Sequence, residues 1–211
     1  MKKLALTLLA ATPLAVSAVA VAPTALAQSG TASDLNAVQA HLKAVDSMTA
    51  DFTQTDRSNQ RLTGKMTLKR PGKIRFQYQK GVPMLIVSDG KALTLIDYEV
   101  KQVQRWPIGN SPLGILLNPN MDMSQYGKVI ETGDPRVLSV EVRDKKRPEY
   151  GAITMVFIRD SASPAGLKLS GWVAMDAQNK RTSIKLSNQK FNVAVPGNAF
   201  AWTDPRPAKR K

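Results

Sequence analysis

The chain has 211 residues, one histidine, no cysteine and a formal net charge of +14. Without cysteine it forms no disulfide, no thiolate metal site and no lipid anchor on a first mature cysteine. The length suits one domain with a sizeable core. The basic residues are spread along predicted strands and are not clustered with aromatics, which favours a solvated basic face or an acidic partner over nucleic acid.

The N-terminus is typical of a secretory signal peptide. Lys2 and Lys3 precede an uncharged apolar stretch that ends in Ala25-Leu26-Ala27, an A-x-A cleavage pattern. A retained membrane anchor is the alternative, because the stretch is long enough to span a bilayer. We predict a cleavable signal peptide at 1–27, a single domain at 28–203 and a basic tail at 204–211, with the mature protein soluble in the periplasm.

One amphipathic helix is expected at the start of the domain. Ser33-Asp34 can cap it, and Leu35, Val38, Leu42, Val45 and Met48 recur at helical spacing to form an apolar stripe. His41 falls on the polar side of this stripe, so we predict a surface position for it.

From Ala50 onward the apolar pattern has a period of two, with turn residues every eight to twelve positions. The predicted strands are 51–56, 61–70, 73–79, 84–88, 92–97, 100–105, 128–131, 137–143, 152–159, 167–175, 181–186 and 189–193. So many consecutive strands predict a meandering antiparallel sheet that curls towards a barrel.

An apolar insert interrupts the strand pattern. Pro107, Gly109, Asn110 and Pro112 stop it, and a short, strongly apolar helical segment follows. Its apolar side chains are Leu113, Ile115, Leu116 and Leu117. Two interpretations stay open, a helix that caps the core and a movable lid over a cavity.

Arg70 breaks the alternation of its own strand. Met66 and Leu68 share the apolar face, and continued counting places Arg70 on that face too. A buried guanidinium needs acceptors, and the carbonyls of an adjacent helix or loop end are suitable. The alternatives are a latch across the barrel mouth and a side chain that turns into solvent at Pro71.

Nothing in the sequence indicates catalysis. It contains no Gly-x-Ser-x-Gly elbow and no cluster with metal-ligand spacing, and its Gly-Lys pairs are never followed by Ser or Thr as in a P-loop. We therefore expect no enzyme activity, catalytic residue, metal or cofactor.

Several motifs, in order and spacing, resemble the outer-membrane lipoprotein carrier family (LolA-like). They are Asp51-Phe52-Thr53-Gln54, Gly64 to Leu68, Lys69-Arg70-Pro71-Gly72, Leu85 to Lys91, Ser111-Pro112-Leu113, Asp176 to Asn179, Arg181 to Leu186 and Phe200-Ala201-Trp202-Thr203. One departure is Ile74, where well-known members have an aromatic residue.

The resemblance implies an α+β, mainly antiparallel β fold: an incomplete, curved β-barrel whose N-terminal helix and short lid helices cover an apolar cavity. It implies Arg70 as the lid latch and Leu113, Ile115, Leu116 and Leu117 as the lid. We assign the lipid cavity to Met66, Leu68, Ile74, Phe76, Tyr78, Leu85, Val87, Leu93 and Leu95. Both faces of 84–88 are apolar, so Leu85 and Val87 are chosen without support from alternation.

The implied function is a monomeric periplasmic carrier of acylated lipoproteins. It would receive them from an ATP-driven inner-membrane releasing complex and deliver them to an outer-membrane receptor. A related curved-barrel regulator that senses lipid or lipoprotein, and a carrier of another lipid, are the alternatives.

Overall fold

The computed structural model describes residues 24–108, 112–176 and 178–207. This part contains one 11-stranded antiparallel sheet and a few helices. The strands are β1 (Ser47–Thr55), β2 (Arg61–Lys69), β3 (Lys73–Tyr78), β4 (Met84–Asp89), β5 (Ala92–Asp97), β6 (Gln102–Pro107), β7 (Gly127–Ile130), β8 (Val137–Arg143), β9 (Ala152–Arg159), β10 (Leu167–Met175) and β11 (Arg181–Phe191). The helices are α1 (Thr24–Ala44), α2 (Pro112–Leu117), α3 (Met123–Tyr126), η2 (Pro148–Tyr150) and η3 (Pro164–Gly166).

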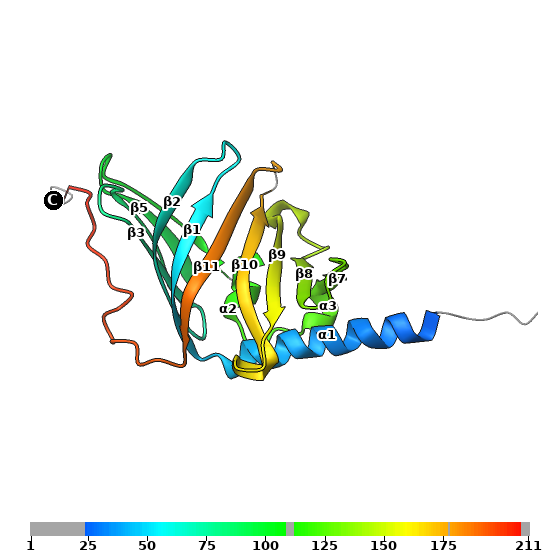
Figure 1. Ribbon diagram of the computed structural model, residues 1–211. Helices are drawn as coiled ribbons and strands as arrows, with labels where there is room; N and C mark the ends of the chain where they lie inside the picture. The colour runs from blue at the N-terminus through cyan, green and yellow to red at the C-terminus, as the bar shows by residue number, and fades with distance from the viewer. Residues whose placement is uncertain (1–23, 109–111, 177, 208–211) are drawn as a thin grey trace, which may run out of the picture.

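Two meanders make up the sheet, whose strand order is β6-β5-β4-β3-β2-β1-β11-β10-β9-β8-β7. The first and last strands, β1 and β11, pair with each other and join the two meanders. Figure 1 shows the sheet strongly curved, with α1 across one end of β8 to β10. The predicted mainly antiparallel, curved β fold with an N-terminal helix is confirmed.

Helix α1 differs from its predicted limits. It runs from Thr24 to Ala44, so Ser33 and Asp34 lie inside it and do not cap its start. Asp34 instead accepts a hydrogen bond from Arg159 of β9, with Nη2 and Oδ1 2.5 Å apart. The stripe residue Met48 belongs to β1, which begins four residues before the predicted strand. Apolar spacing alone did not separate the end of the helix from the start of the strand.

His41 is buried, and its predicted surface position is wrong. The side chain is 2 % exposed, and Nδ1 lies 2.9 Å from the carbonyl oxygen of Pro164 in η3. The ring packs edge-on against Phe157 and Phe191. The β9–β10 connection thus covers a second side of α1, which a single apolar stripe does not reveal.

One strand replaces two predicted ones at the end of the sheet. Residues 181–186 and most of 189–193 form the continuous strand β11, whose register with β1 shifts between Thr49 and Asp51. The shift is a β-bulge, which reverses the alternation within one strand and looks like a break in the pattern.

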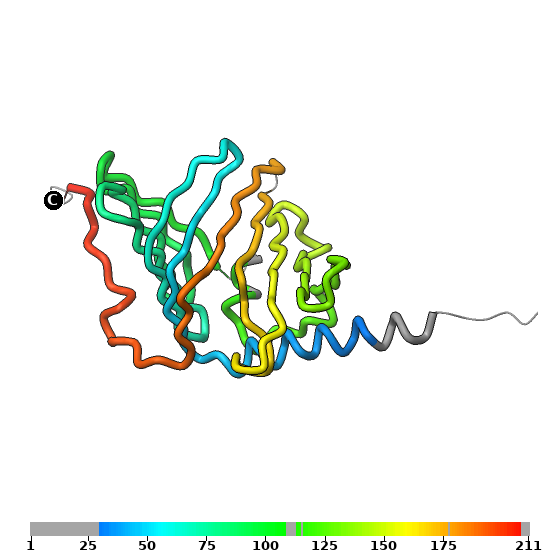
Figure 2. The backbone as a smooth tube through the Cα atoms, viewed as in Figure 1, coloured from blue at the N-terminus to red at the C-terminus, as the bar shows by residue number. Residues whose placement is uncertain are grey.

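Two apolar clusters lie on opposite faces of the sheet. The large one fills the concave face beneath α1 and α2. The small one, Leu85, Val87 and Ile96, lies on the convex face and packs against Phe200 and Trp202. These last two residues belong to the C-terminal segment (residues 192–207), which runs along the outside of the β1–β6 meander in Figure 2.

Candidate functional site

Arg70 occupies a buried position at the end of β2. Its side chain is 7 % exposed. Nε donates to the carbonyl oxygen of Val45 at 2.9 Å, and Nη1 donates to that of Leu116 at 2.5 Å. The backbone N–H of Arg70 donates to the carbonyl oxygen of Asp46 at 2.7 Å. One residue therefore connects the β2–β3 turn to the α1–β1 connection and to α2, and the position predicted by strand alternation is confirmed.

A second hydrogen bond reaches the same end of α2. The N–H of Gly72 donates to the carbonyl oxygen of Leu117 at 3.1 Å. The last carbonyls of a helix have no partner within the helix, so a buried helix end needs donors from elsewhere. The β2–β3 turn supplies two of them, at Leu116 and Leu117. The short helix is thus held at its C-terminal end by hydrogen bonds from the β2–β3 turn.

The guanidinium of Arg70 keeps its charge in this position. Burial lowers the pKa of Arg70 to about 10, and the carboxylate of Asp46 opposes the shift. Near neutral pH the group is therefore protonated. Hydrogen bonds to charged donors are stronger than neutral ones. In the described part of the chain, no buried side-chain nitrogen or oxygen lacks a hydrogen-bond partner.

Ser88 fixes the turn that holds α2. Its fully buried hydroxyl donates to the carbonyl oxygen of Gly72 at 2.7 Å and accepts from the N–H of Gly90 at 3.1 Å. Gly72 has φ +77°, and a Cβ there would lie 2.7 Å from the Cα of Gly90. The two turns β2–β3 and β4–β5 therefore touch backbone to backbone, and only glycine fits at Gly72.

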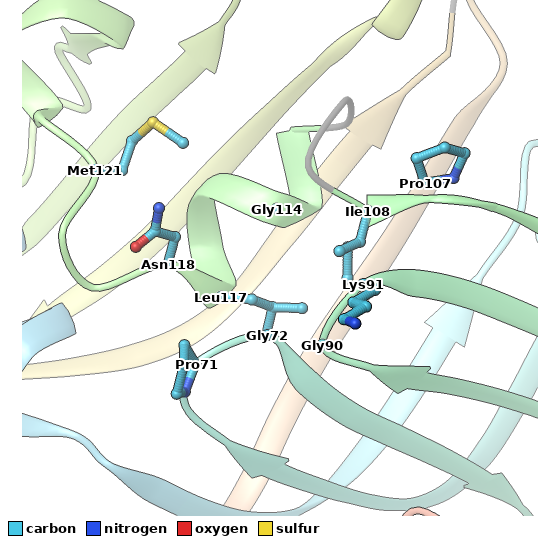
Figure 3. Close-up of a pocket in the computed structure, with 10 residues that line it drawn as sticks. All are labelled: Pro71, Gly72, Gly90, Lys91, Pro107, Ile108, Gly114, Leu117, Asn118 and Met121. Atoms are coloured by element: carbon cyan, nitrogen blue, oxygen red, sulfur yellow. The ribbon is translucent and has the colours of Figure 1, made fainter.

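A pocket of about 570 Å³ lies between these turns and α2. Figure 3 shows Gly114 and Leu117 of α2 on one side of it and the two turns on the other. The lining residues are Pro71, Gly72, Gly90, Lys91, Pro107, Ile108, Gly114, Leu117, Asn118 and Met121. Open space thus adjoins the hydrogen bonds that hold α2.

The predicted lid residues lie in α2. Leu116 and Leu117 are 1 % and 0 % exposed in the concave core, and Leu113 packs partly buried against it. The side chain of Ile115 lies outside the described residues. That α2 moves as a lid, and that Arg70 acts as its latch, stay predictions.

Most of the predicted cavity residues share the concave face. Met66, Leu68, Ile74, Phe76, Tyr78 and Leu93 are buried in the concave cluster. Leu95 is half-buried, and its pairing with Ile86 places it on the same face. These side chains form one continuous apolar surface with the underside of α2. Their role in binding lipid stays a prediction.

The assignment of Leu85 and Val87 to this face is wrong. Both belong to the convex cluster, and Leu85 lies opposite Gln77 of β3, whose side chain is exposed on the outer side of the sheet. Their neighbours Met84 and Ile86 pack against the concave core instead. Both faces of β4 are apolar because each is covered, one by the concave core and the other by the C-terminal segment.

Four aromatic rings from three strands meet on the concave face, and two of them were not predicted. Phe52 of β1 contacts Phe76 and Tyr78 edge-on, with ring centroids 5.2 Å apart in both pairs. Phe76 also faces Trp172 of β10 at 6.1 Å. Alternation with Met48 and Ala50 could have revealed Phe52. Trp172 follows a bulge between Leu169 and Gly171, where counting by two fails.

Tyr78 is the polar member of this aromatic group. Its hydroxyl donates to Oε1 of Gln54 at 2.6 Å. Burial raises the pKa of Tyr78 to about 12. The phenol is therefore neutral at any physiological pH, so the concave face carries no charge at this point.

Within the described residues, no group of three or more acidic, histidine or cysteine side chains is placed to hold a metal ion. No helix in the same part of the chain is long and apolar enough to cross a membrane.

The family model and the curated relatives indicate one family. Residues 43–203 match the family model described as outer membrane lipoprotein carrier protein LolA. An outer-membrane lipoprotein carrier protein of Chromobacterium violaceum is 30 % identical over 184 residues, covering 83 % of this chain and 85 % of that protein. One of Legionella pneumophila is 26 % identical over 178 residues, covering 80 % and 85 %.

Among solved structures, a LolA superfamily protein of Nitrosomonas europaea has a TM-score of 0.45 at 11 % identity and covers 82 % of this chain and 97 % of that one. The family match spans the sheet, both turns that hold α2 and the C-terminal segment as far as Thr203. On this match the chain is a member of the LolA family of outer-membrane lipoprotein carrier proteins.

Proposed function

We propose that the protein carries acylated lipoproteins through the periplasm and buries their acyl chains against the concave face of the sheet. The observation that carries this proposal is the attachment of α2. Its two fully buried leucines cover the apolar face, yet its C-terminal end is held by two hydrogen bonds from the β2–β3 turn. A cover of this kind can be exchanged for an apolar ligand.

The energetics favour a cavity whose cover is exchanged for the cargo, rather than a cavity that is permanently open. Burial of an acyl chain gains roughly 0.8 kcal/mol per methylene group, so several chains taken from water would exceed any useful affinity. Cargo that comes from one bilayer and enters another needs a site that binds the acyl chains with intermediate affinity. Leu116 and Leu117 compete with the acyl chains for the concave face and so weaken retention.

The transport route is part of the proposal. An ATP-driven inner-membrane complex would release the lipoprotein to this carrier, and an outer-membrane receptor would accept it, with the carrier acting as a monomer. Residues 1–27 would direct export and be removed, residues 28–203 would form the carrier domain, and 204–211 would be a tail. Cleavage after Ala27 would shorten α1 by about its first turn.

Native mass spectrometry of the periplasmic fraction tests the proposal. The chain is expressed together with a lipoprotein that has its acylated cysteine, or with the same lipoprotein carrying serine there. A one-to-one complex is expected only with the acylated form. Equal recovery of both forms, or of neither, would contradict a carrier of acyl chains.

Depletion followed by membrane fractionation separates a carrier from a regulator. A carrier predicts that lipoproteins remain in the inner membrane when the protein is depleted. A regulator of similar fold predicts normal sorting.

A further inference from the structure

The convex face of β11, β1, β2 and β3 is strongly basic. These four neighbouring strands carry eight lysines and arginines, and Asp51 is their only acidic residue. Alternation and the bulge in β11 direct all eight basic side chains to the convex side, away from the concave core. We define the basic face by its six most regular members, which are Arg61, Lys65, Lys69, Lys73, Arg181 and Lys185; all six are exposed.

The basic face is poorly neutralised within the chain. Asp51 pairs with Lys65 and also accepts a hydrogen bond from Asn188 at 2.7 Å. The other five members form no ion pair with any carboxylate in the described ranges. Lys69 lies directly opposite Lys73 across β2 and β3. Like charges at such a position are destabilising, and an added negative charge would relieve the repulsion.

Hydroxyl groups separate the charges in a regular array. Thr53 of β1 lies between Lys185 of β11 and Thr63 of β2, and Thr49 lies between Lys190 and Thr67. Strands are about 4.8 Å apart, so Lys185 and Thr63, two strands apart, are separated by roughly 10 Å along the sheet. The side chains of this array are hydrogen-bond donors at fixed positions, and Asp51 is its only negative charge. Such an array is suited to bind carboxylates on the surface of a folded protein.

A bilayer fits this face less well than a protein does. The sheet is convex here (Figure 1), so a flat membrane would touch only its crest. The exposed large apolar side chains of the described residues are Tyr98, Val100 and Trp106, and none lies on these four strands. Surface binding to membranes usually combines basic residues with apolar ones that enter the interface. We propose that the basic face is a docking surface for an acidic surface of a partner protein.

This docking surface does not depend on the cargo. It lies on the opposite side of the sheet from the concave face, so binding there leaves α2 and the Arg70 contacts free. Electrostatic docking of this kind accelerates association and weakens with salt. Such a contact suits a carrier that must dissociate from its partner again, because it raises the association rate without a large apolar interface that would slow dissociation.

Two variants with the same loss of charge test the proposal. The first, Arg61→Gln/Lys69→Gln/Lys185→Gln, removes three charges from the basic face. The matched control, Lys80→Gln/Lys101→Gln/Lys145→Gln, removes three exposed charges from turns outside it. Poly-L-glutamate is the acidic probe, and phosphatidylcholine vesicles containing phosphatidylglycerol are the membrane probe. Urea unfolding establishes that both variants are folded.

Binding of poly-L-glutamate should weaken about tenfold in the basic-face variant and less than about twofold in the control, with a smaller salt dependence in the former. Equal losses in both variants would show that only net charge matters and would overturn the proposal. So would absence of poly-L-glutamate binding by the parent protein, or loss of vesicle binding alone in the basic-face variant. None of these outcomes bears on acyl-chain binding, which is measured separately with lipoprotein.

Discussion

Two segments cover apolar surface on opposite faces of one sheet. Helix α2 covers the concave face, and the C-terminal segment covers the convex cluster. Each accepts a hydrogen bond from an arginine at the end or middle of a strand. Arg70 donates to Leu116, and Nη1 of Arg75 donates to the carbonyl oxygen of Ala201 at 2.8 Å.

The two covers differ in what holds them. Arg70 is buried, and open space adjoins the helix end that it contacts. Arg75 is half-buried and shares its donors with Gln77, while Phe200 and Trp202 supply apolar contact along the C-terminal segment. Helix α2 combines two buried leucines with buried polar contacts at one end, and we expect it to leave as a unit when those polar contacts break. We expect the C-terminal segment, whose apolar contacts are spread along the chain, to stay in place.

The largest expected effect on the difference between the two covers comes from Arg70→Leu, with Arg75→Leu as its control. Loss of the guanidinium leaves the carbonyls of Val45 and Leu116 without their donor, at a cost of roughly 1–3 kcal/mol each. Helix α2 should then leave the concave face more often, so an apolar naphthalene-sulfonate dye should bind several-fold more strongly. Cargo should also be retained more tightly and handed over more slowly.

Fluorescence titration and a transfer assay to acceptor membranes provide the measurements. Arg75→Leu should leave dye binding at the concave face unchanged. If Arg70→Leu released lipoprotein as fast as the parent protein, the latch would be refuted.

The C-terminal segment is tested by Trp202→Ala. A fully buried aromatic residue contributes about 3–5 kcal/mol, so half-buried Trp202 should contribute about 2 kcal/mol to the free energy of unfolding. Trp106→Ala, at a residue 39 % exposed on the edge strand β6, should cost less than about 1 kcal/mol. Urea unfolding measures both. Increased dye binding at the concave face in Trp202→Ala would mean that the two covers are coupled and the comparison is too simple.

Ser88→Ala should weaken the attachment of α2 indirectly. The carbonyl of Gly72 and the N–H of Gly90 lose their shared partner, which costs roughly 1–2 kcal/mol. Because Gly72 also donates to Leu117, dye binding should rise, though less than in Arg70→Leu. Ser187→Ala, at an exposed position on β11, is the control and should change neither quantity. A loss of stability with unchanged dye binding would limit Ser88 to a structural role.

The sequence predicted well what depends on short-range alternation. Arg70 was placed on the apolar face because β2 alternates without a bulge, and Met66 and Leu68 fix its parity. The insert after Pro112 was predicted as a short helix because prolines bound an apolar run. The hydrogen bond from Arg70 to Leu116 joins residues 46 positions apart and was predicted only as one alternative.

What the sequence did not predict depends on segments distant in the chain. Leu85 and Val87 cannot be assigned to a face by β4 alone, because the C-terminal segment makes its outer face apolar as well. Trp172 follows a bulge, which reverses the parity. His41 is buried by η3, 123 residues further along, so its helix shows only one apolar stripe.

His41 therefore gives the last prediction, a pH dependence of stability. Burial lowers the pKa of His41, the nearby Arg70 lowers it further, and the carbonyl of Pro164 opposes the shift. The folded protein binds the proton less readily than the unfolded chain, whose histidine has its ordinary pKa near 6.5. The stabilising contribution is complete above about pH 6.5 and is lost as the pH falls from there through the pKa of the folded state.

His41→Asn isolates this contribution. Asn places an amide N–H near the position of Nδ1, so it can still donate to Pro164, and it does not titrate. The variant loses the edge-on contacts with Phe157 and Phe191, at a cost of about 1 kcal/mol that is independent of pH. Urea unfolding between about pH 8 and pH 5 should show the parent protein losing stability towards the acid end more steeply than the variant. Parallel curves would mean that folding leaves the pKa of His41 unchanged, so that its protonated form is tolerated beside Arg70.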